Sequence, residues 1–301
     1  MTNAALPPKA RGAPSAHPVR RRPNLAWLGI APFLIFAAAF LLIPTTYLIV
    51  GSFLDSSGHV TVKNYADLTQ QVPINAYLTS IEISFVTAFA GGVIGFLMAY
   101  AVISGGLPRP LRSGLMTFSG VASNFAGVPL ALAFTFTLGR VGLLTVFLNK
   151  ILGVDIYGHG FSLYTKLGLE VVYFYFQLPL MILIIAPAID GLKKEWREAS
   201  ENMGASSAQF WRYVALPVLM PSLLGAMILL FGNAFGAQAT AFQLTGGFIN
   251  LVPILIGNQL TGDVLHNVGL GYALAMGMVA ILAVTLVAYS FLQRRSEQWL
   301  R

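Results

Sequence analysis

The sequence predicts an all-α protein that crosses a membrane six times, with both termini in the cytoplasm. Three observations predict this fold. Of 301 residues, 56% are hydrophobic and only 10% are charged, whereas soluble domains contain about 25% charged residues. Six segments are long and apolar enough to cross a bilayer, which takes about 20 residues per helix. The basic residues gather in alternate connections between these segments, which is the usual signature of membrane orientation.

The six predicted spans cover residues 27–50, 78–104, 113–138, 163–190, 218–244 and 266–292. The first is too long for the apolar part of a cleaved signal peptide, and no small-residue cleavage site follows it. Glycines and polar residues interrupt the fifth, and the apolar stretch at 248–260 behind it is expected to be interfacial or re-entrant. Residues 25–301 are therefore expected to form one transmembrane domain.

The distribution of basic residues fixes the predicted orientation. Residues 1–24 are expected to form a disordered basic cytoplasmic tail, in which five prolines accompany Lys9, Arg11, Arg20, Arg21 and Arg22. With this tail inside, 14 of the 18 basic residues fall in cytoplasmic segments. The other four basic residues fall in extracytoplasmic segments: Lys63, Arg140, Lys150 and Lys166. The net charge of +7 is therefore explained by the basic residues that orient the chain in the membrane, and no nucleic-acid partner is expected. The chain has no cysteine, which excludes disulfides and thiolate metal sites.

The connection between the fourth and fifth predicted spans, at about 191–217, has the pattern of two short helices joined by a glycine turn. Apolar side chains recur at helical spacing along the first helix, at Leu192, Trp196, Ala199 and Met203. Gly204 suits a left-handed turn, Ser206 suits the start of the second helix, and Pro217 is expected to end that helix. Two short helices joined in this way would project from the membrane and could bind in a groove on a cytoplasmic partner. The same row of apolar side chains would also suit a helix that lies on lipid headgroups.

This stretch resembles the EAA loop of binding-protein-dependent ABC permeases. The family pattern is Glu-Ala-Ala, three residues, glycine, nine residues, then Ile-x-Leu-Pro. Here Glu198-Ala199-Ser200 is followed by three residues and Gly204, and nine residues later by Val214-Ala215-Leu216-Pro217. Ser200 replaces the second alanine and Val214 replaces the isoleucine. The resemblance extends over most of the chain. It is nearest to the spermidine/putrescine-type permeases, a group that also includes iron(III), thiamine and aminoalkylphosphonate importers.

The resemblance implies a type I ABC importer permease fold. In that fold two permease chains form the pore, two ATPases clamp the coupling loops, and an extracytoplasmic binding protein delivers the substrate; the second permease is expected to be a different chain. The residues that the resemblance assigns to ATPase coupling are Glu195, Trp196, Glu198, Ala199, Ser200, Met203, Gly204, Ala205, Arg212, Leu216 and Pro217. The chain has no G-x-x-x-x-G-K-[S/T] phosphate loop. We therefore expect no cofactor in this chain, no catalysis by it, and the use of ATP and Mg²⁺ by the partner ATPase.

Polar side chains within the predicted spans are candidates for a substrate path, because such groups are costly in a bilayer. They are Asn124, Gln177, Asn233, Gln238, Glu82, Glu170, Tyr173 and Tyr175. The amides have an alternative role in hydrogen bonds between helices. The two acids and the tyrosines would attract a cation, which makes a polyamine the first expected substrate. The alternative is that the acids are solvated at the membrane interface and that the tyrosines belong to an aromatic belt.

A secondary transporter and an intramembrane enzyme are the two alternative classes of function. An ion-coupled secondary transporter usually shows inverted repeats and charges near the membrane midplane, and an intramembrane enzyme needs a catalytic cluster within the spans. The sequence shows none of these features, and the EAA-like loop favours the permease. The histidines, at 17, 59, 159 and 266, are scattered, so no metal site is expected. Gly91-x-x-x-Gly95 and Gly232-x-x-x-Gly236 would each allow two helices to approach closely, without specifying which.

Overall fold

The computed structural model describes residues 26–55, 57–261 and 266–297, and its regular elements in these ranges are all helices. The basic tail predicted at 1–24, with His17, lies outside the described residues. The chain divides into two compact units, of which the first ends at Tyr47 and the second begins at Leu48. Among the described residues, no group of three histidines and carboxylates is close enough to hold a metal ion.

The first unit is a single apolar helical run. It consists of α1 (Ala26–Ala37), one π-helical turn η1 (Ala38–Leu42) and the first half of α2 (Ile43–Ser52), which continues into the second unit. The hydroxyls of Thr45 and Thr46 donate to the carbonyl oxygens of Leu41 and Leu42, at 2.6 and 2.8 Å. These bonds keep the two polar groups satisfied within the helix, as a lipid environment requires.

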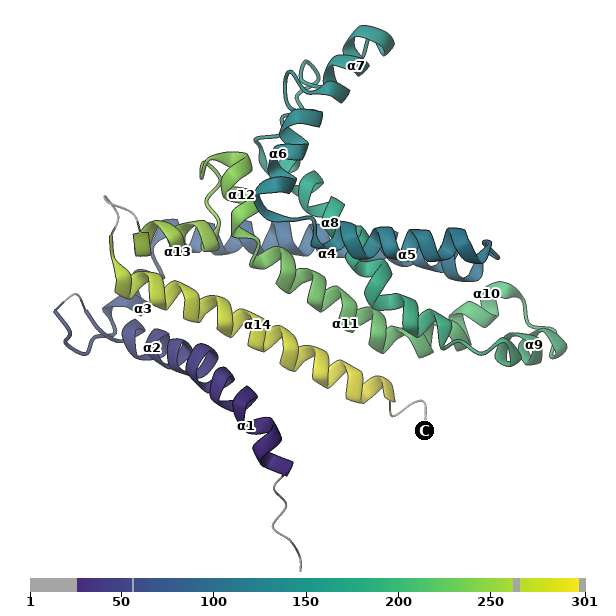
Figure 1. Cartoon of the computed structure of the whole chain (residues 1–301), viewed down its shortest axis with the longest axis horizontal. Coiled ribbons are helices and arrows are strands. Elements are labelled where there is room, and N and C mark those ends of the chain that lie inside the picture. Colours follow the sequence, from purple (N-terminus) through teal and green to yellow (C-terminus); the bar gives the residue numbers. More distant parts are fainter. Residues whose placement is uncertain (1–25, 56, 262–265, 298–301) are drawn as a thin grey trace, which may run out of the picture. The chain divides into compact units, whose positions relative to one another are not determined.

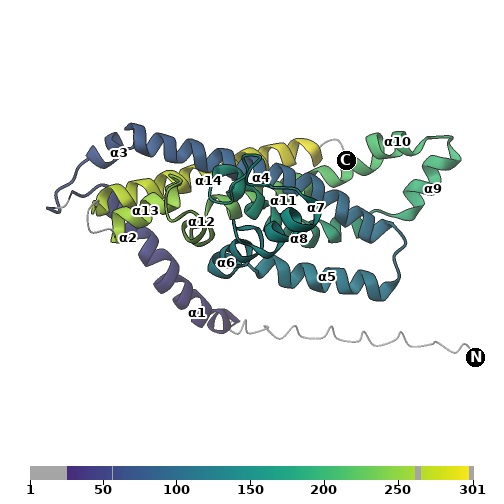
Figure 2. The ribbon, with the colours of Figure 1, turned by 90° about the horizontal axis from the view of Figure 1, so that it is seen from above.

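The second unit holds the other helices. They are α3 (Lys63–Asp67), α4 (Gln71–Ser104), α5 (Arg109–Asn124), α6 (Gly127–Leu138), α7 (Leu143–Leu152), α8 (Lys166–Asp190), α9 (Lys194–Asn202), α10 (Ser207–Phe210), the π-helical turn η2 (Trp211–Ala215), α11 (Leu216–Phe235), α12 (Gln238–Thr245), α13 (Val252–Thr261) and α14 (Val268–Glu297). Helices α4, α8, α11 and α14 run alongside one another in Figure 1 and form a bundle. Figures 1 and 2 both place α9 and α10 at one end of this bundle and α3 and α13 at the other.

Six helical segments are long and apolar enough to span a membrane, so the predicted number of spans is confirmed. They are Gly29–Ser52, Gln71–Ser104, Gly127–Leu152, Lys166–Asp190, Ser207–Phe235 and Val268–Phe291. The predicted bounds of the third span, 113–138, are wrong, because the helix breaks at residues 125–126. The fifth predicted span, 218–244, is also too long, because α11 ends at Phe235. The stretch expected to be interfacial or re-entrant contains the short helix α13.

One of the two glycine motifs brings two helices of the bundle together. A β-carbon placed on Gly91 would lie 2.5 Å from Cβ of Gln177, and one on Gly95 would lie 2.7 Å from Cβ of Met181. Both distances are too short for real atoms, so α4 can approach α8 this closely only because these residues are glycines. The second motif has no such contact, because β-carbons on Gly232 and Gly236 would meet nothing nearer than 3.6 Å.

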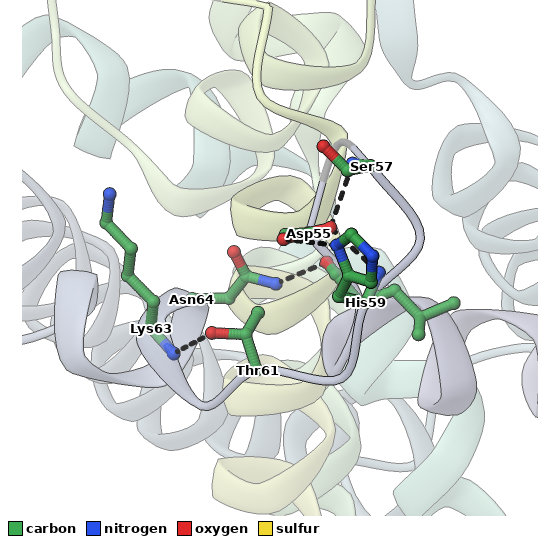
Figure 3. Close-up of polar contacts among 7 residues, drawn as sticks. Asp55, Ser57, His59, Thr61, Lys63 and Asn64 are labelled. Atoms are coloured by element: carbon green, nitrogen blue, oxygen red, sulfur yellow. Dashed lines mark hydrogen bonds and ion pairs between the residues drawn. The ribbon is translucent and has the colours of Figure 1, made fainter.

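The loop that joins α2 to α3 is held in a fixed shape by side chains (Figure 3). A carboxylate oxygen of Asp55 accepts hydrogen bonds from the backbone amides of Ser57 and His59, at 2.8 and 2.9 Å. The His59 amide in particular holds the pKa of Asp55 below its usual value. The buried amide of Asn64 donates to the carbonyl oxygens of Ser52 and Leu54, at 3.0 and 2.9 Å. These contacts close the loop into a hairpin.

Candidate functional site

The loop between α8 and α11 consists of two short helices joined by a left-handed glycine. Helix α9 ends at Asn202, and Gly204 follows with φ = +80°. This conformation suits glycine because it has no β-carbon. Ser206 then starts α10 with a capping box, in which its side chain accepts from the Gln209 amide at 3.3 Å and its own amide donates to Gln209 Oε1 at 2.7 Å. The predicted helix, glycine turn and second helix are therefore present.

Helix α9 is exposed along most of its length. Ser200 is the one buried residue of α9, and its hydroxyl donates to the carbonyl oxygen of Arg197 at 2.8 Å. Trp196 and Met203 lie in the open, with 36% and 81% of their surfaces exposed. Exposed large apolar side chains on a short polar helix favour contact with another surface. The assigned coupling residues Glu195, Glu198, Ala199 and Gly204 are also exposed, as is Arg212, whereas Ala205, Leu216 and Pro217 are partly buried.

Trp211 fixes this loop to the transmembrane bundle. Its indole ring makes edge contacts with Tyr100 and Phe96 of α4, with ring centroids 4.7 and 6.3 Å apart. At the same end, Arg112 of α5 forms two hydrogen bonds with the carboxylate of Asp190, the last residue of α8, at 2.7 and 2.6 Å. The loop thus rises from a base in which α4, α5 and α8 are tied together. A displacement of the loop would be transmitted to these helices.

The expectation that Pro217 ends the second short helix is wrong. Residues Ser207–Phe235 form one continuous helical segment, and Pro217 lies in the first turn of α11. The helix accommodates the proline with the π-helical turn η2 directly before it. In this turn the amide of Leu216 donates to the carbonyl oxygen of Trp211, five residues earlier. Proline has no amide hydrogen to donate, and a local change in helix pitch is one way to accommodate it.

Two helix breaks meet beside α8, inside the unit. The first separates α5 from α6 and includes Gly127, with φ = +72°; the second separates α11 from α12 at Ala237. The hydroxyl of Thr240 accepts from the amide of Gly127 at 2.9 Å and lies 3.3 Å from its carbonyl oxygen. The hydroxyl of Tyr173 donates to the carbonyl oxygen of Ala237 at 2.5 Å. The polar groups that the breaks expose are thus bonded to one another and to α8.

The length of α5 predicts that these breaks lie within the membrane. Helix α5 has 16 residues, which cover about 24 Å, less than the hydrocarbon thickness of about 30 Å. It begins beside the end of α8, through Arg112 and Asp190. Non-helical backbone is tolerated within a membrane only where protein surrounds it or where it lines a polar cavity. The bonds to Thr240 and Tyr173 meet the first condition, because they satisfy the broken backbone within the protein.

The predicted path residues separate into two groups in the structure. Gln177 and Tyr173 are buried, and the Gln177 amide donates to the carbonyl oxygen of Leu230 at 2.8 Å. These two residues therefore join helices, and we leave them out of the proposed path. Tyr175 packs edge-on against Phe134, with ring centroids 5.4 Å apart. Of the other five, the three amides are exposed, with Asn124 and Gln238 next to the two breaks and Asn233 one turn before the second.

The two acids gather with a lysine that was not predicted to join them. Lys166, the first residue of α8, forms an ion pair with Glu82 of α4. Glu170, one turn further along α8, interacts electrostatically with both. The side chains of Glu82 and Lys166 are 58% and 39% exposed, so this pair lies at the surface of the chain. The cluster therefore carries one net negative charge at the end of the bundle opposite the loop.

Comparison with known proteins decides the family. The family of binding-protein-dependent transport system inner membrane components matches residues 91–301, more than two thirds of the chain. The chain belongs to this family. It is a permease subunit of an ABC importer, a multi-pass protein of the inner membrane and a transport subunit rather than an enzyme.

Two curated relatives and one solved structure are similar to this chain over most of its length. The permease PotB of the spermidine/putrescine transport system of Haemophilus influenzae is 27% identical over 86% of this chain and 90% of its own length. The permease CysT of the sulfate transport system of Salmonella typhimurium is 26% identical over 73% and 74%. A chain of a bacterial ABC transporter that imports alginate has the same fold, with a TM-score of 0.70 at 17% identity over 90% and 95%.

Several residues of the permease that position the site were missed in the sequence. One is the pair formed by Arg112 and Asp190, although opposite charges at the same end of neighbouring spans are a signal in the sequence. Another is Trp211, whose contacts with α4 have no local signal. Thr240 gave no signal, because a threonine in an apolar helix usually satisfies itself by bonding the preceding turn.

Trp211→Ala is predicted to weaken the mechanical connection of the permease loop to α4. The substitution removes two aromatic contacts, each of which contributes about 0.5–1.5 kcal/mol. We expect the substrate uptake rate to fall about tenfold while the exposed face of α9 stays intact. Uptake by cells expressing each variant at matched membrane levels measures this. Tyr213→Ala is the control, because Tyr213 is 68% exposed; equal loss in both variants would contradict the anchoring role.

Proposed function

We propose that this permease forms half of a solute path and couples it to a separate cytoplasmic ATPase through the loop at 195–217. The observation that carries the proposal is the form of this loop, which exposes an apolar and acidic face on α9 and is fixed at its base by Trp211. An ATPase that grips the exposed face would move the loop, and the fixed base would pass that movement to α4 and α8. ATP and Mg²⁺ belong to the ATPase in this proposal.

The remaining partners and the orientation follow from the same proposal. Both termini of the permease lie in the cytoplasm, as the distribution of basic residues favours. Two ATPase subunits and a second, different permease chain complete the membrane complex, and an extracytoplasmic binding protein delivers the solute. One of the solved structures of the same fold is an alginate transporter in complex with a ligand-bound periplasmic protein, which supports a partner of this kind.

The proposed path passes the paired helix breaks. Asn124, Asn233 and Gln238 expose their amides there, and each amide supplies both a donor and an acceptor for a polar solute. The amide of Asn124 donates one hydrogen bond to the carbonyl oxygen of Gly120 at 2.9 Å, which leaves its oxygen and its second N–H for a solute. Rocking of the helices against each other would open and close access to these groups.

For the substrate we propose a polyamine. The acid cluster at the far end of the bundle already holds an alkylammonium group, that of Lys166, on the carboxylate of Glu82. This arrangement supports the idea that the ammonium group of a polyamine can be held in the same way, with Glu170 as the second acid. The relative from the spermidine/putrescine system favours this substrate, and the relatives from sulfate systems favour an inorganic anion.

A pair of substitutions separates these two substrates. Glu82→Gln together with Glu170→Gln removes the negative charge and is expected to lower spermidine uptake at limiting concentration about fivefold, since each solvent-exposed charge pair contributes about 0.2–1 kcal/mol. Lys166→Gln is the matched control, since it removes a competing ammonium group and should preserve or raise spermidine uptake. Uptake of labelled spermidine and labelled sulfate, measured in cells that lack other carriers for each, tests this.

The opposite pattern would overturn the polyamine proposal. If the permease carries sulfate, the double variant Glu82→Gln/Glu170→Gln should leave sulfate uptake unchanged or raise it. Lys166→Gln should then lower sulfate uptake. Spermidine uptake that is unaffected by the double substitution would also reject the role of the two acids.

A further inference from the structure

A second polar site lies away from the bundle, where α6 ends and α7 begins. Figure 1 shows α6 and α7 leading away from α4, α8 and α11. A cavity of about 540 Å³ opens beside α7, and six of the residues that line it carry polar groups: Arg140, Thr145, Asn149, Lys150, Asp155 and Tyr157.

The charge balance of this cavity is positive. Arg140 and Lys150 are two of the four basic residues that the topology places outside, where basic residues are usually scarce. In the described part of the chain, neither makes an ion pair within 4 Å, whereas Lys166 is paired with Glu82. The guanidinium of Arg140 lies 5.9 Å from the ring centroid of Tyr157, which holds it at the cavity.

The one acid in the lining is already engaged. A carboxylate oxygen of Asp155 accepts from the backbone amides of Tyr157 and Gly158, at 3.1 and 2.9 Å. The hydroxyl of Tyr157 donates to the carbonyl oxygen of Leu138 at 2.9 Å and is thus also occupied. Thr145 is buried, and its hydroxyl has no hydrogen-bond partner among the described residues. The cavity therefore combines two unpaired cations with an unsatisfied hydroxyl, which suits an anion.

Helix α7 places an apolar face next to the cavity. Leu143, Phe147 and Ile151 are spaced four residues apart and are 78%, 47% and 65% exposed. Thr145 and Asn149 lie on another side of this helix, whereas Lys150, seven residues after Leu143, lies beside the apolar stripe. In a membrane such a stripe faces acyl chains, and a lysine beside it extends its ammonium group to the headgroups. Acyl chains would cover the apolar stripe, and the cavity would then face the headgroups.

We propose that this cavity binds the phosphate of an anionic phospholipid headgroup, with Arg140 and Lys150 as the charged ligands. The lipid would fix α7 at the membrane surface and so hold the far end of α6, whose near end is bonded to α12 at the helix breaks. The proposal does not depend on which solute the permease carries. Free inorganic phosphate has the same chemistry but would make no use of the apolar stripe.

The test is native mass spectrometry of the full chain in a neutral detergent, titrated with phosphatidylglycerol or phosphatidylcholine. We expect phosphatidylglycerol to bind the wild type more tightly, and the Arg140→Gln/Lys150→Gln double variant to lose that affinity about thirtyfold. The matched control is Lys63→Gln, which removes a basic residue of the same predicted side away from the cavity and should bind as the wild type does. Each single variant is expected to lose about fivefold, so the proposal remains testable if the double variant does not fold.

Three results would overturn the proposal. One is equal affinity of the wild type for the two lipids, because the headgroup charge would then not be recognised. Another is unchanged affinity for phosphatidylglycerol in folded variants at Arg140 and Lys150. The last is displacement of phosphatidylglycerol by inorganic phosphate at equal concentration, which would identify a site for a free anion instead of a lipid site.

Discussion

Replacing Gly204 with aspartate is expected to leave the permease inserted in the membrane and to lower the rate of ATP-driven uptake about tenfold or more, a loss of about 1.4 kcal/mol in coupling. A β-carbon on Gly204 would meet no atom within 4 Å, so the new side chain would project from the tip of the loop. It would add a negative charge to a surface that already carries Glu198 and Glu201. Uptake in cells, normalised to the amount of permease in the membrane, measures the effect.

Gly204→Asn is the matched control for this substitution. Asparagine has nearly the same shape as aspartate and, like it, tolerates a positive φ better than most residues do. We expect Gly204→Asn to retain most of the uptake, because it adds bulk without charge. A normal uptake rate in Gly204→Asp would show that this loop does not couple the permease to its energy source.

The double substitution Gly91→Ala/Gly95→Ala is expected to destabilise the bundle by about 2–6 kcal/mol, since overpacking costs about 1–3 kcal/mol at each site. The new methyl groups would be forced against Gln177 and Met181 of α8, and the one on Gly95 would also lie 3.1 Å from the carbonyl oxygen of Leu178. Backbone atoms cannot give way as a side chain can, so the two helices must move apart. The temperature at which the protein in detergent loses its monodisperse peak on size-exclusion chromatography measures this.

The second glycine motif supplies the control with the same chemistry. In Gly232→Ala/Gly236→Ala, the added methyl groups would meet only ordinary contacts at 3.6 Å. We expect little change in the denaturation temperature of this variant, with a small gain at Gly232 because alanine favours helix. Equal losses in both double variants would show that glycine content, and not the approach of α4 to α8, determines the stability.

These two predictions rest on different kinds of information. The Gly204 turn could be predicted from the sequence, because apolar residues at helical spacing precede this glycine and the capping residue Ser206 follows it. The contrast between the glycine motifs could not, because a motif records only the absence of side chains and not what lies opposite. The six spans were predictable from composition, since lipid requires long apolar helices.

The path region was the least predictable part of the permease. Asn124, Gly127 and Pro129 mark the break at 125–126 in the sequence, but nothing there identifies its bonding partner Thr240, more than a hundred residues away in the chain. For the same reason, Gln177 and Tyr173 could not be distinguished in the sequence from residues that face a solute. Their burial depends on the packing of α8 against α4 and α11.

The most direct test of the account is whether the loop at 195–217 holds an ATPase. The permease would be purified from its native membrane by affinity, and the proteins that accompany it would be identified by mass spectrometry, for the wild type and for Gly204→Asp. The account predicts that an ATP-binding subunit accompanies the wild type and is lost or strongly reduced with Gly204→Asp, while the second permease chain is retained with both. Recovery of the permease with no ATP-binding subunit, or equal recovery of that subunit with both forms, would contradict it.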